Sequence, residues 1–183
     1  FRMLIASGAK VVDQWKGQLR VVSSAGEPLN PEVIRWFEQA LDAPIFDHYG
    51  QTETGMVVCN HHALSHPVYA GSAGFASPGY RIAVVNEQGE ELPADTPGIL
   101  AVDVNQSPMM WFSGYVESRK SPFIGQYYLT GDTAEIHEDG SMSFVGRSDD
   151  VITTSGYRVG PFDVESALLE HDAVVEAAVI GVP

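Results

Sequence analysis

The sequence has a single cysteine, few basic residues and no long apolar run. The lone Cys59 excludes an internal disulfide framework and fits a reducing cytoplasm. No apolar run approaches the roughly 20 residues of a membrane-spanning helix, so we expect no membrane span. The chain contains three lysines, seven arginines and 24 acidic residues, and its net charge is -14. General nucleic-acid binding is therefore disfavoured, because it needs basic stripes. An anionic ligand must instead be held by an Arg, a metal ion or backbone N–H groups.

The composition is that of a globular protein, 44% hydrophobic and 19% charged, and 183 residues can hold one large domain or parts of two. The chain opens at Phe1-Arg2-Met3 and closes at Gly181-Val182-Pro183, both in apolar segments. We therefore expect an internal piece of a longer polypeptide.

The first third of the chain predicts a strand, a helix and a second strand. We expect strands at 19–24 and 43–46, and a helix that begins where Asn30 precedes Pro31. Apolar residues at helical spacing give this helix one buried face: Val33, Ile34, Phe37 and Leu41. Such a βαβ unit implies a parallel sheet with ligands at the carboxyl ends of its strands, where residues 26–28 and 47–55 lie.

From residue 67 the pattern changes to short strands separated by turns. Strands are expected at 80–85, 98–104, 127–130, 134–137 and 141–145. They predict a small antiparallel β subdomain that curls towards a barrel. After Arg147 the pattern predicts a strand at 151–154, a helix at 161–170 and a strand at 174–182.

The predicted fold class is α/β plus β, in three parts. Residues 1–66 would end a parallel α/β subdomain, and residues 67–148 would form the barrel-like subdomain. Residues 149–183 would begin a small α+β C-terminal domain.

The run 47–55, Asp-His-Tyr-Gly-Gln-Thr-Glu-Thr-Gly, concentrates polar groups after the second strand. Gly50 and Gly55 allow backbone N–H groups to approach a ligand closely. Thr52 offers a hydroxyl and Glu53 a hard anionic oxygen suited to Mg²⁺, a mixture that suits a polyphosphate with its metal. Taken alone, the run is equally well interpreted as a polar loop that caps the next element.

A second cluster, Cys59, His61, His62 and His66, first suggests zinc. Its spacing matches no closed ligand set, and we favour surface or boundary histidines over a metal site.

Two later runs place carboxylates beside glycine. Asp132 follows Thr130-Gly131, and a carboxylate there can accept from the vicinal hydroxyls of a ribose, or simply satisfy a turn. Arg147 follows Gly146 and precedes Ser148-Asp149-Asp150. Arg147 is one of few candidates to hold an anionic ligand, and the two aspartates would form a solvated turn or a hinge.

The run 153–165 contains Ser-Gly-Tyr-Arg-Val-Gly-Pro-Phe-Asp-Val-Glu. A strand, a turn and a capped helix explain Pro161, Asp163 and Glu165. They do not explain Gly156-Tyr157-Arg158.

In their order and separation, the runs at 49–55, 130–132, 146–150 and 155–165 resemble core motifs of the adenylate-forming enzymes. This superfamily comprises acyl-CoA synthetases, luciferases and peptide-synthetase adenylation domains. The resemblance spans essentially the whole chain and is strongest to the medium-chain acyl-CoA synthetases and their acetyl-CoA synthetase relatives. It implies a ligase that uses ATP, Mg²⁺, CoA and a small-molecule carboxylate. The carboxylate attacks the α-phosphate of ATP to give an acyl-adenylate and pyrophosphate, and the CoA thiol then displaces AMP.

The resemblance also implies roles by position. Thr52 would lie near the α-phosphate and the acyl carboxylate, Glu53 would bind Mg²⁺, and Asp149 would be the hinge of a small C-terminal domain. Asp132 would bind the ribose, and Arg147 the ribose and phosphate. The other implied nucleotide contacts are Gly26, Glu27, Pro28, Asp47, His48, Tyr49, Gly50 and Gln51, and the implied CoA contacts are Ser155, Gly156, Tyr157 and Arg158.

Gly50 also bears on the acyl group. Acetate-specific members of the family carry Trp at this position, so Gly50 predicts an acyl group longer than acetyl. Ile99 stands where the family usually has Glu, which affects no named site residue.

The family's phosphate-binding loop is missing. Its catalytic lysine, expected near the end of the C-terminal domain, is missing as well, because all three lysines of this chain precede Arg147. We therefore expect this chain alone to be inactive. Two other hypotheses stay open: an adenylation domain that loads a carrier protein, and a non-catalytic fragment that binds nucleotide.

Overall fold

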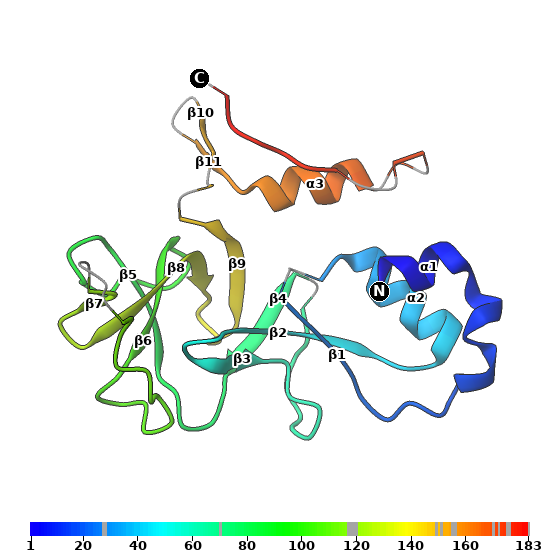
Figure 1. Ribbon diagram of the computed structural model, residues 1–183, viewed down its shortest axis with the longest axis horizontal. Helices are drawn as coiled ribbons and strands as arrows, with labels where there is room; N and C mark the ends of the chain where they lie inside the picture. The colour runs from blue at the N-terminus through cyan, green and yellow to red at the C-terminus, as the bar shows by residue number, and fades with distance from the viewer. Residues whose placement is uncertain are drawn as a thin grey trace.

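The chain folds around one mixed β-sheet with few helices (Figure 1). The computed structural model describes residues 1–26, 29–69, 71–116, 121–148, 150, 152–154, 157–169, 171, 173–174 and 177–182, and only the backbone of Arg2, Thr153, Tyr157, Arg158 and Asp163. The sheet has nine strands in the order β1-β2-β3-β4-β9-β8-β6-β5, with β7 paired to β8. Its strands are β1 (Val22–Ala25), β2 (Ile45–Gln51), β3 (Gly55–Cys59), β4 (Ser72–Ala76), β5 (Ile82–Val85), β6 (Gly98–Asp103), β7 (Phe123–Ile124), β8 (Tyr127–Ile136) and β9 (Met142–Arg147).

The predicted βαβ unit is confirmed. β1 pairs in parallel with β2, and α2 (Pro31–Leu41) connects them. α2 begins where predicted because the Asn30 side chain accepts a hydrogen bond from the Glu32 N–H at 2.8 Å. Its buried face packs in a core cluster with neighbours from β2 and the preceding segments: Val12, Leu29, Val33, Phe37, Ala40, Leu41, Ala43 and Ile45. The short helices α1 (Arg2–Ser7), η1 (Ala9–Val11) and η2 (Asp13–Trp15) precede β1.

The prediction of a buried strand at 19–24 is wrong in its bounds. Leu19 and Val21 are exposed, and β1 starts at Val22. Only the part of the apolar run that lies beside β2 forms strand hydrogen bonds, because pairing needs a neighbouring edge.

The polar run 47–55 is a hairpin and not a loop, which corrects the expected end of the second strand. β2 continues through Tyr49 and Gly50 to Gln51, residues 52–54 form the turn, and β3 returns antiparallel to β2. The register shifts between Tyr49 and Gly50. A Cβ at Gly50 would lie 2.2 Å from the Gly55 carbonyl oxygen, so the two backbones approach closely only because residue 50 is glycine.

The strands predicted at 127–130 and 134–137 are one strand, β8, and Asp132 lies inside it. Gly131 has a φ of 76°, and the pairing with β9 shifts register between Thr133 and Ala134. The glycine therefore bends the strand without ending it.

The expected strands at 80–85, 98–104 and 141–145 correspond to β5, β6 and β9, whereas β3, β4, β7 and β11 (Tyr157–Val159) were not predicted. Strands β3, β6, β8 and β9 share one hydrophobic core, which includes Val57, Val58, Leu100, Val102, Tyr128, Ala134 and Met142. The path of paired strands among the described residues runs from β1 to β5, so the expected barrel-like curl is not confirmed.

The C-terminal segment contains the hairpin of β10 (Ile152–Thr154) and β11 (Tyr157–Val159), followed by α3 (Pro161–Leu169) (Figure 1). The prediction of a strand at 174–182 is wrong, because the described residues of this segment form none. The Val179 N–H instead donates to the Glu165 carboxylate at 2.9 Å, so a side chain of α3 takes the place of a strand partner. Among the described residues, no helix has the length and apolar character needed to cross a membrane.

Candidate functional site

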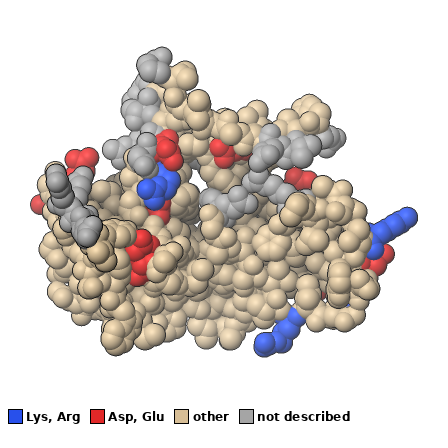
Figure 2. Space-filling model, viewed as in Figure 1, with Lys and Arg blue, Asp and Glu red and all other residues tan. Residues whose placement is uncertain are grey.

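A cavity of about 400 Å³ opens between β2, β8, β9 and the loop that follows β1. Its lining residues are Gly26, Asp47, His48, Tyr49, Gly50, Gln51, Ala73, Asp132, Phe144 and Arg147. The structure thus brings together site residues predicted from four separate runs of the sequence. On the face seen in Figure 2, Lys and Arg side chains are few and scattered. Charge at this cavity is therefore set by individual side chains and not by a basic surface.

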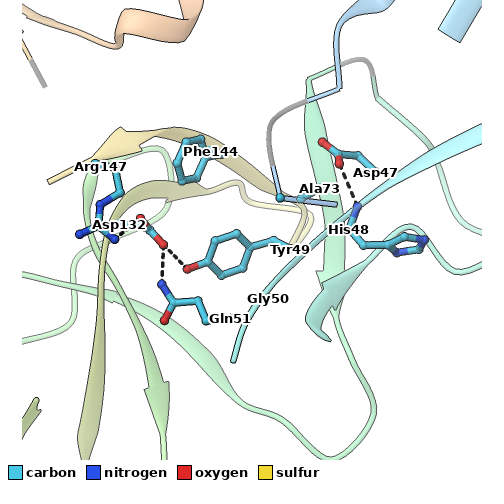
Figure 3. A pocket seen from close by; sticks show the side chains of 10 residues that line it. Asp47, His48, Tyr49, Gly50, Gln51, Ala73, Asp132, Phe144 and Arg147 are labelled. Atoms are coloured by element: carbon cyan, nitrogen blue, oxygen red, sulfur yellow. Dashed lines mark hydrogen bonds and ion pairs between the residues drawn. The ribbon is translucent and has the colours of Figure 1, made fainter. Parts of the chain in front are cut away.

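The centre of the cavity wall is the carboxylate of Asp132, which is 4% exposed. It accepts hydrogen bonds from the Tyr49 hydroxyl and from the Gln51 amide, the latter at 2.8 Å. Its other oxygen lies 3.3 Å from the Arg147 guanidinium. Figure 3 shows Tyr49 and Gln51 reaching Asp132 from β2, while Arg147 approaches from β9.

Strand register explains why Asp132 and Arg147 meet. They are directly opposed across the β8–β9 pair, although 15 residues separate them in the chain. A Cβ at Gly131 would lie 3.6 Å from the guanidinium, an ordinary van der Waals contact, so glycine is favoured here by its φ of 76° and not by a need for space. Half of the Arg147 side chain stays exposed, which suits a group that meets a ligand from solvent.

The Gln51 amide is fixed from both ends. Its nitrogen also donates to the Thr130 carbonyl at 2.9 Å, and its oxygen accepts from the Tyr128 hydroxyl at 3.0 Å. The pKa of Tyr49 is raised mainly by burial and also by its hydrogen bond to Asp132. The pKa of Tyr128 is raised mainly by burial as well. Both phenols therefore stay protonated and act as donors, so the network holds a single arrangement.

Asp47 fixes the rim of the cavity nearest β1. Its carboxylate accepts from the Leu29 N–H and the His48 N–H, both at 3.0 Å. Leu29 follows the loop that contains Gly26, so Asp47 holds this loop against β2. Glu27 and Pro28, which were predicted to contact the nucleotide, lie outside the described residues.

His48 points away from the Asp132 group (Figure 3). Burial is the main cause that lowers its pKa, followed by the neighbouring His62 and His61. Its Nδ1 atom is buried and has no hydrogen-bond partner among the described residues. His48 is therefore held neutral beside the cavity.

Two residues of the suspected zinc cluster, His61 and His66, contact each other, whereas His62 and Cys59 contact residues outside the cluster. The His62 ring stacks on Phe46 with centroids 4.3 Å apart, and His66 accepts from the His61 N–H at 2.8 Å. Cys59 Sγ lies 3.0 Å from the Ser77 hydroxyl. The interpretation as surface or boundary histidines stays a prediction.

Thr52 and Glu53 lie in the turn between β2 and β3 and are not among the residues that line the cavity. Thr52 is exposed and Glu53 is half-buried. The Tyr115 hydroxyl donates to Glu53 Oε1 at 2.8 Å, and this hydrogen bond is the main cause that raises the pKa of Tyr115. The Glu53 carboxylate offers hard anionic oxygens, which fit Mg²⁺.

The remaining predicted residues belong to the hinge and the CoA site. Asp149, Ser155 and Gly156 lie outside the described residues. Tyr157 and Arg158 form part of β11, and their side chains are not described.

Sequence reasoning missed Ala73, Phe144 and Tyr115. The Phe144 ring lies 6.2 Å from that of Tyr49, centroid to centroid, and forms one wall of the cavity. Alternation along the predicted strand at 141–145 would place Phe144 and Arg147, three residues apart, on opposite faces, so it carries no signal that both line the cavity. Ala73 lies on β4, a strand that was not predicted from the sequence.

Comparison with known proteins gives a consistent result. The family described as AMP-binding enzyme matches residues 1–116. The 4-hydroxybutyrate–CoA ligase 1 of Metallosphaera sedula is 49% identical over 94% of this chain and 31% of that protein. The acetyl-coenzyme A synthetase of Bacillus subtilis is 44% identical over the whole chain and 32% of its own length.

Among solved structures, the crystal structure of the Brucella canis acyl-CoA synthetase is similar with a TM-score of 0.78 and 64% sequence identity. The match covers 100% of this chain and 34% of that one. The chain thus spans about a third of the length of the proteins it matches.

Proposed function

Because the chain belongs to the AMP-binding enzyme family, we propose that it carries the nucleotide-binding part of an AMP-forming acyl-CoA synthetase. In that reaction a carboxylate displaces pyrophosphate from ATP to form an acyl-adenylate, and the CoA thiol then displaces AMP. The proposal is supported by relatives that are named as CoA ligases and acyl-CoA synthetases.

The observation that carries the proposal is the buried Asp132 carboxylate at the cavity wall. A carboxylate has about four acceptor positions, and three donors reach Asp132 here: Tyr49, Gln51 and Arg147. The Arg147 contact with Asp132, at 3.3 Å, is longer than the Gln51 contact, at 2.8 Å. We propose that Arg147 turns towards the phosphate when the two ribose hydroxyls donate to Asp132.

The other roles follow from position in the cavity. The adenine would lie between the Tyr49–Phe144 wall and the loop at 26–28, and Asp47 accepts from the N–H of Leu29, directly after that loop. Thr52 would contact the α-phosphate and Glu53 would hold Mg²⁺, which when bound neutralises charge on the phosphates. Asp149 would be the hinge, and the segment 155–158 would face CoA.

The acyl group is proposed to be longer than acetyl, because Gly50 carries no side chain to close the pocket. Binding of acetyl-AMP and hexanoyl-AMP to the chain measures this preference directly. Tighter binding of the acetyl adenylate would contradict it.

The ribose contact is tested by a thermodynamic cycle in titration calorimetry. AMP and 2′,3′-dideoxy-AMP are titrated without divalent cations into the wild-type chain and into Asp132→Asn, which keeps the shape but loses the charge. Hydrogen bonds to a charged acceptor contribute about 1.5–3 kcal/mol, so AMP affinity should fall roughly tenfold to a hundredfold in the variant. The affinity for dideoxy-AMP should not change.

Glu135→Gln is the matched control, since it neutralises another carboxylate of β8 that does not line the cavity. It should bind AMP like the wild type. Equal losses for AMP and dideoxy-AMP in Asp132→Asn would contradict the ribose assignment.

A further inference from the structure

A segment outside the cavity lies against the turn that carries Glu53. This 107–116 segment follows β6 and begins at Ser107, whose hydroxyl accepts from the Arg81 N–H at 2.8 Å. The Tyr80 hydroxyl lies 2.7 Å from the Thr54 carbonyl oxygen and 3.1 Å from that of Met109. One phenol thus joins the turn 52–54 to the 107–116 segment.

The same segment is fixed on its inner side by aromatic packing. The Phe112 ring contacts Tyr128 with centroids 5.4 Å apart and Tyr115 with centroids 5.0 Å apart, both edge to face. Tyr128 is 1% exposed and donates to Gln51 in the Asp132 network. The position of Tyr115 is therefore set by the same buried ring that supports the cavity wall.

At the end of this chain of contacts, the Tyr115 hydroxyl meets Glu53 Oε1 at 2.8 Å. Tyr115 is 51% exposed, so its phenol is not needed to fill a core. A phenol that donates to one oxygen of a carboxylate fixes the rotation of that carboxylate and leaves its second oxygen for another partner.

We propose that Tyr115 is a positioning residue that orients the Glu53 carboxylate for a hard divalent cation. The inference rests on the proposed function, which assigns Mg²⁺ to Glu53, and adds the residue that prepares that ligand. Groups that hydrogen-bond to metal ligands typically change metal affinity by 10–100-fold when removed. Tyr115 acts through Glu53 and is not itself a ligand.

The test measures Mn²⁺ binding to the chain by electron paramagnetic resonance of the free ion, with Mg²⁺ as competitor. Four proteins are compared: the wild type, Tyr115→Phe, Glu53→Gln and Tyr69→Phe. Tyr69 is the matched control, because it is 48% exposed and its phenol is likewise hydrogen-bonded to a carboxylate, that of Asp139. Since the chain carries a net charge of -14 and the ligand atoms of Asp95, Glu135 and His137 lie within 4.8 Å of one another, Mn²⁺ binding elsewhere is expected, and Glu53→Gln identifies the component that belongs to Glu53.

One Mn²⁺ component should disappear in Glu53→Gln, and that component should weaken about tenfold in Tyr115→Phe and stay unchanged in Tyr69→Phe. In the wild type, Mn²⁺ should also broaden the NMR signals of the Tyr115 ring, and this broadening should be lost in Glu53→Gln. Equal melting temperatures of wild type and Tyr115→Phe would separate positioning from a fold defect.

Wild-type affinity in Tyr115→Phe would overturn the inference, and so would Glu53→Gln with the same Mn²⁺ components as the wild type. Neither result bears on the ribose cycle with Asp132→Asn, which uses AMP without divalent cations. Failure of the inference and failure of the proposed function are therefore distinguishable.

Discussion

The two halves of the polar hairpin differ in how they are held. Tyr49 and Gln51 lie within β2 and donate to a buried carboxylate on β8. Thr52 and Glu53 lie in the turn beyond, where Thr52 is exposed and Glu53 is held by an exposed tyrosine. The strand half is pre-organised by the sheet, whereas the turn half depends on the 107–116 segment. We infer that the strand half recognises a part of the ligand of constant shape, and that the turn half can adjust to a metal and its phosphates.

The largest expected effect comes from removing the carboxylate of the strand half. Asp132→Ala leaves the Tyr49 hydroxyl and one Gln51 donor without their acceptor in a buried site, and the free energy of unfolding should fall by about 3 kcal/mol. Urea denaturation of the wild type and the variant measures this change.

Glu53→Ala provides the comparison from the turn half. It removes one partly exposed hydrogen bond, so the free energy of unfolding should fall by less than about 1 kcal/mol. Equal losses in the two variants would contradict the distinction between a rigid strand half and an adaptable turn.

Two glycines of the hairpin sharpen the comparison further. A Cβ at Gly50 would lie 2.2 Å from the Gly55 carbonyl oxygen, so Gly50→Ala must displace backbone and should destabilise by about 2 kcal/mol. A Cβ at Gly55 would meet only the Tyr80 hydroxyl, at 3.9 Å, and Gly55→Ala should cost about 1 kcal/mol for its φ of 69°. Thermal unfolding of both variants measures the difference, and a larger loss at Gly55 would be inconsistent with the close contact of β2 and β3.

This contact also changes how Gly50 can be used. A bulky residue at position 50 would disturb the hairpin before it reached an acyl pocket. Acyl length is therefore better tested with different adenylates on the wild-type chain.

Sequence reasoning succeeded where local chemistry decides the structure. Asn30 and Pro31 start α2 at the predicted residue because the cap is made within a few residues. The motifs likewise identified Asp132, Arg147 and the 47–51 run, which the structure brings to one cavity.

It failed where a distant partner decides. Gly131 was interpreted as the end of a strand, but pairing with β6 and β9 carries β8 through it. The apolar residues at 174–182 suggested a strand, yet Glu165 satisfies the Val179 N–H in its place. Tyr115 carries no signal towards Glu53, because 62 residues separate them and packing of Phe112 sets their contact.

The smallest expected effect concerns the edge of the cavity, where His48 is held neutral. Its pKa is lowered in the folded protein, mainly by burial, relative to about 6.5 in the unfolded chain. The unfolded chain therefore binds more protons below neutral pH, and the stability that neutral His48 contributes is lost as the pH falls below about 6.5 towards the folded value.

The free energy of unfolding should decrease modestly between pH 7.5 and pH 5.5, and it should decrease less in His48→Gln. His62, whose pKa burial also lowers, should account for part of the remaining slope. His171→Gln, at an exposed position, is the control and should keep the wild-type slope. An unchanged slope in His48→Gln would show that His48 is not kept neutral by the fold, and the rim of the cavity would then be as adaptable as the turn.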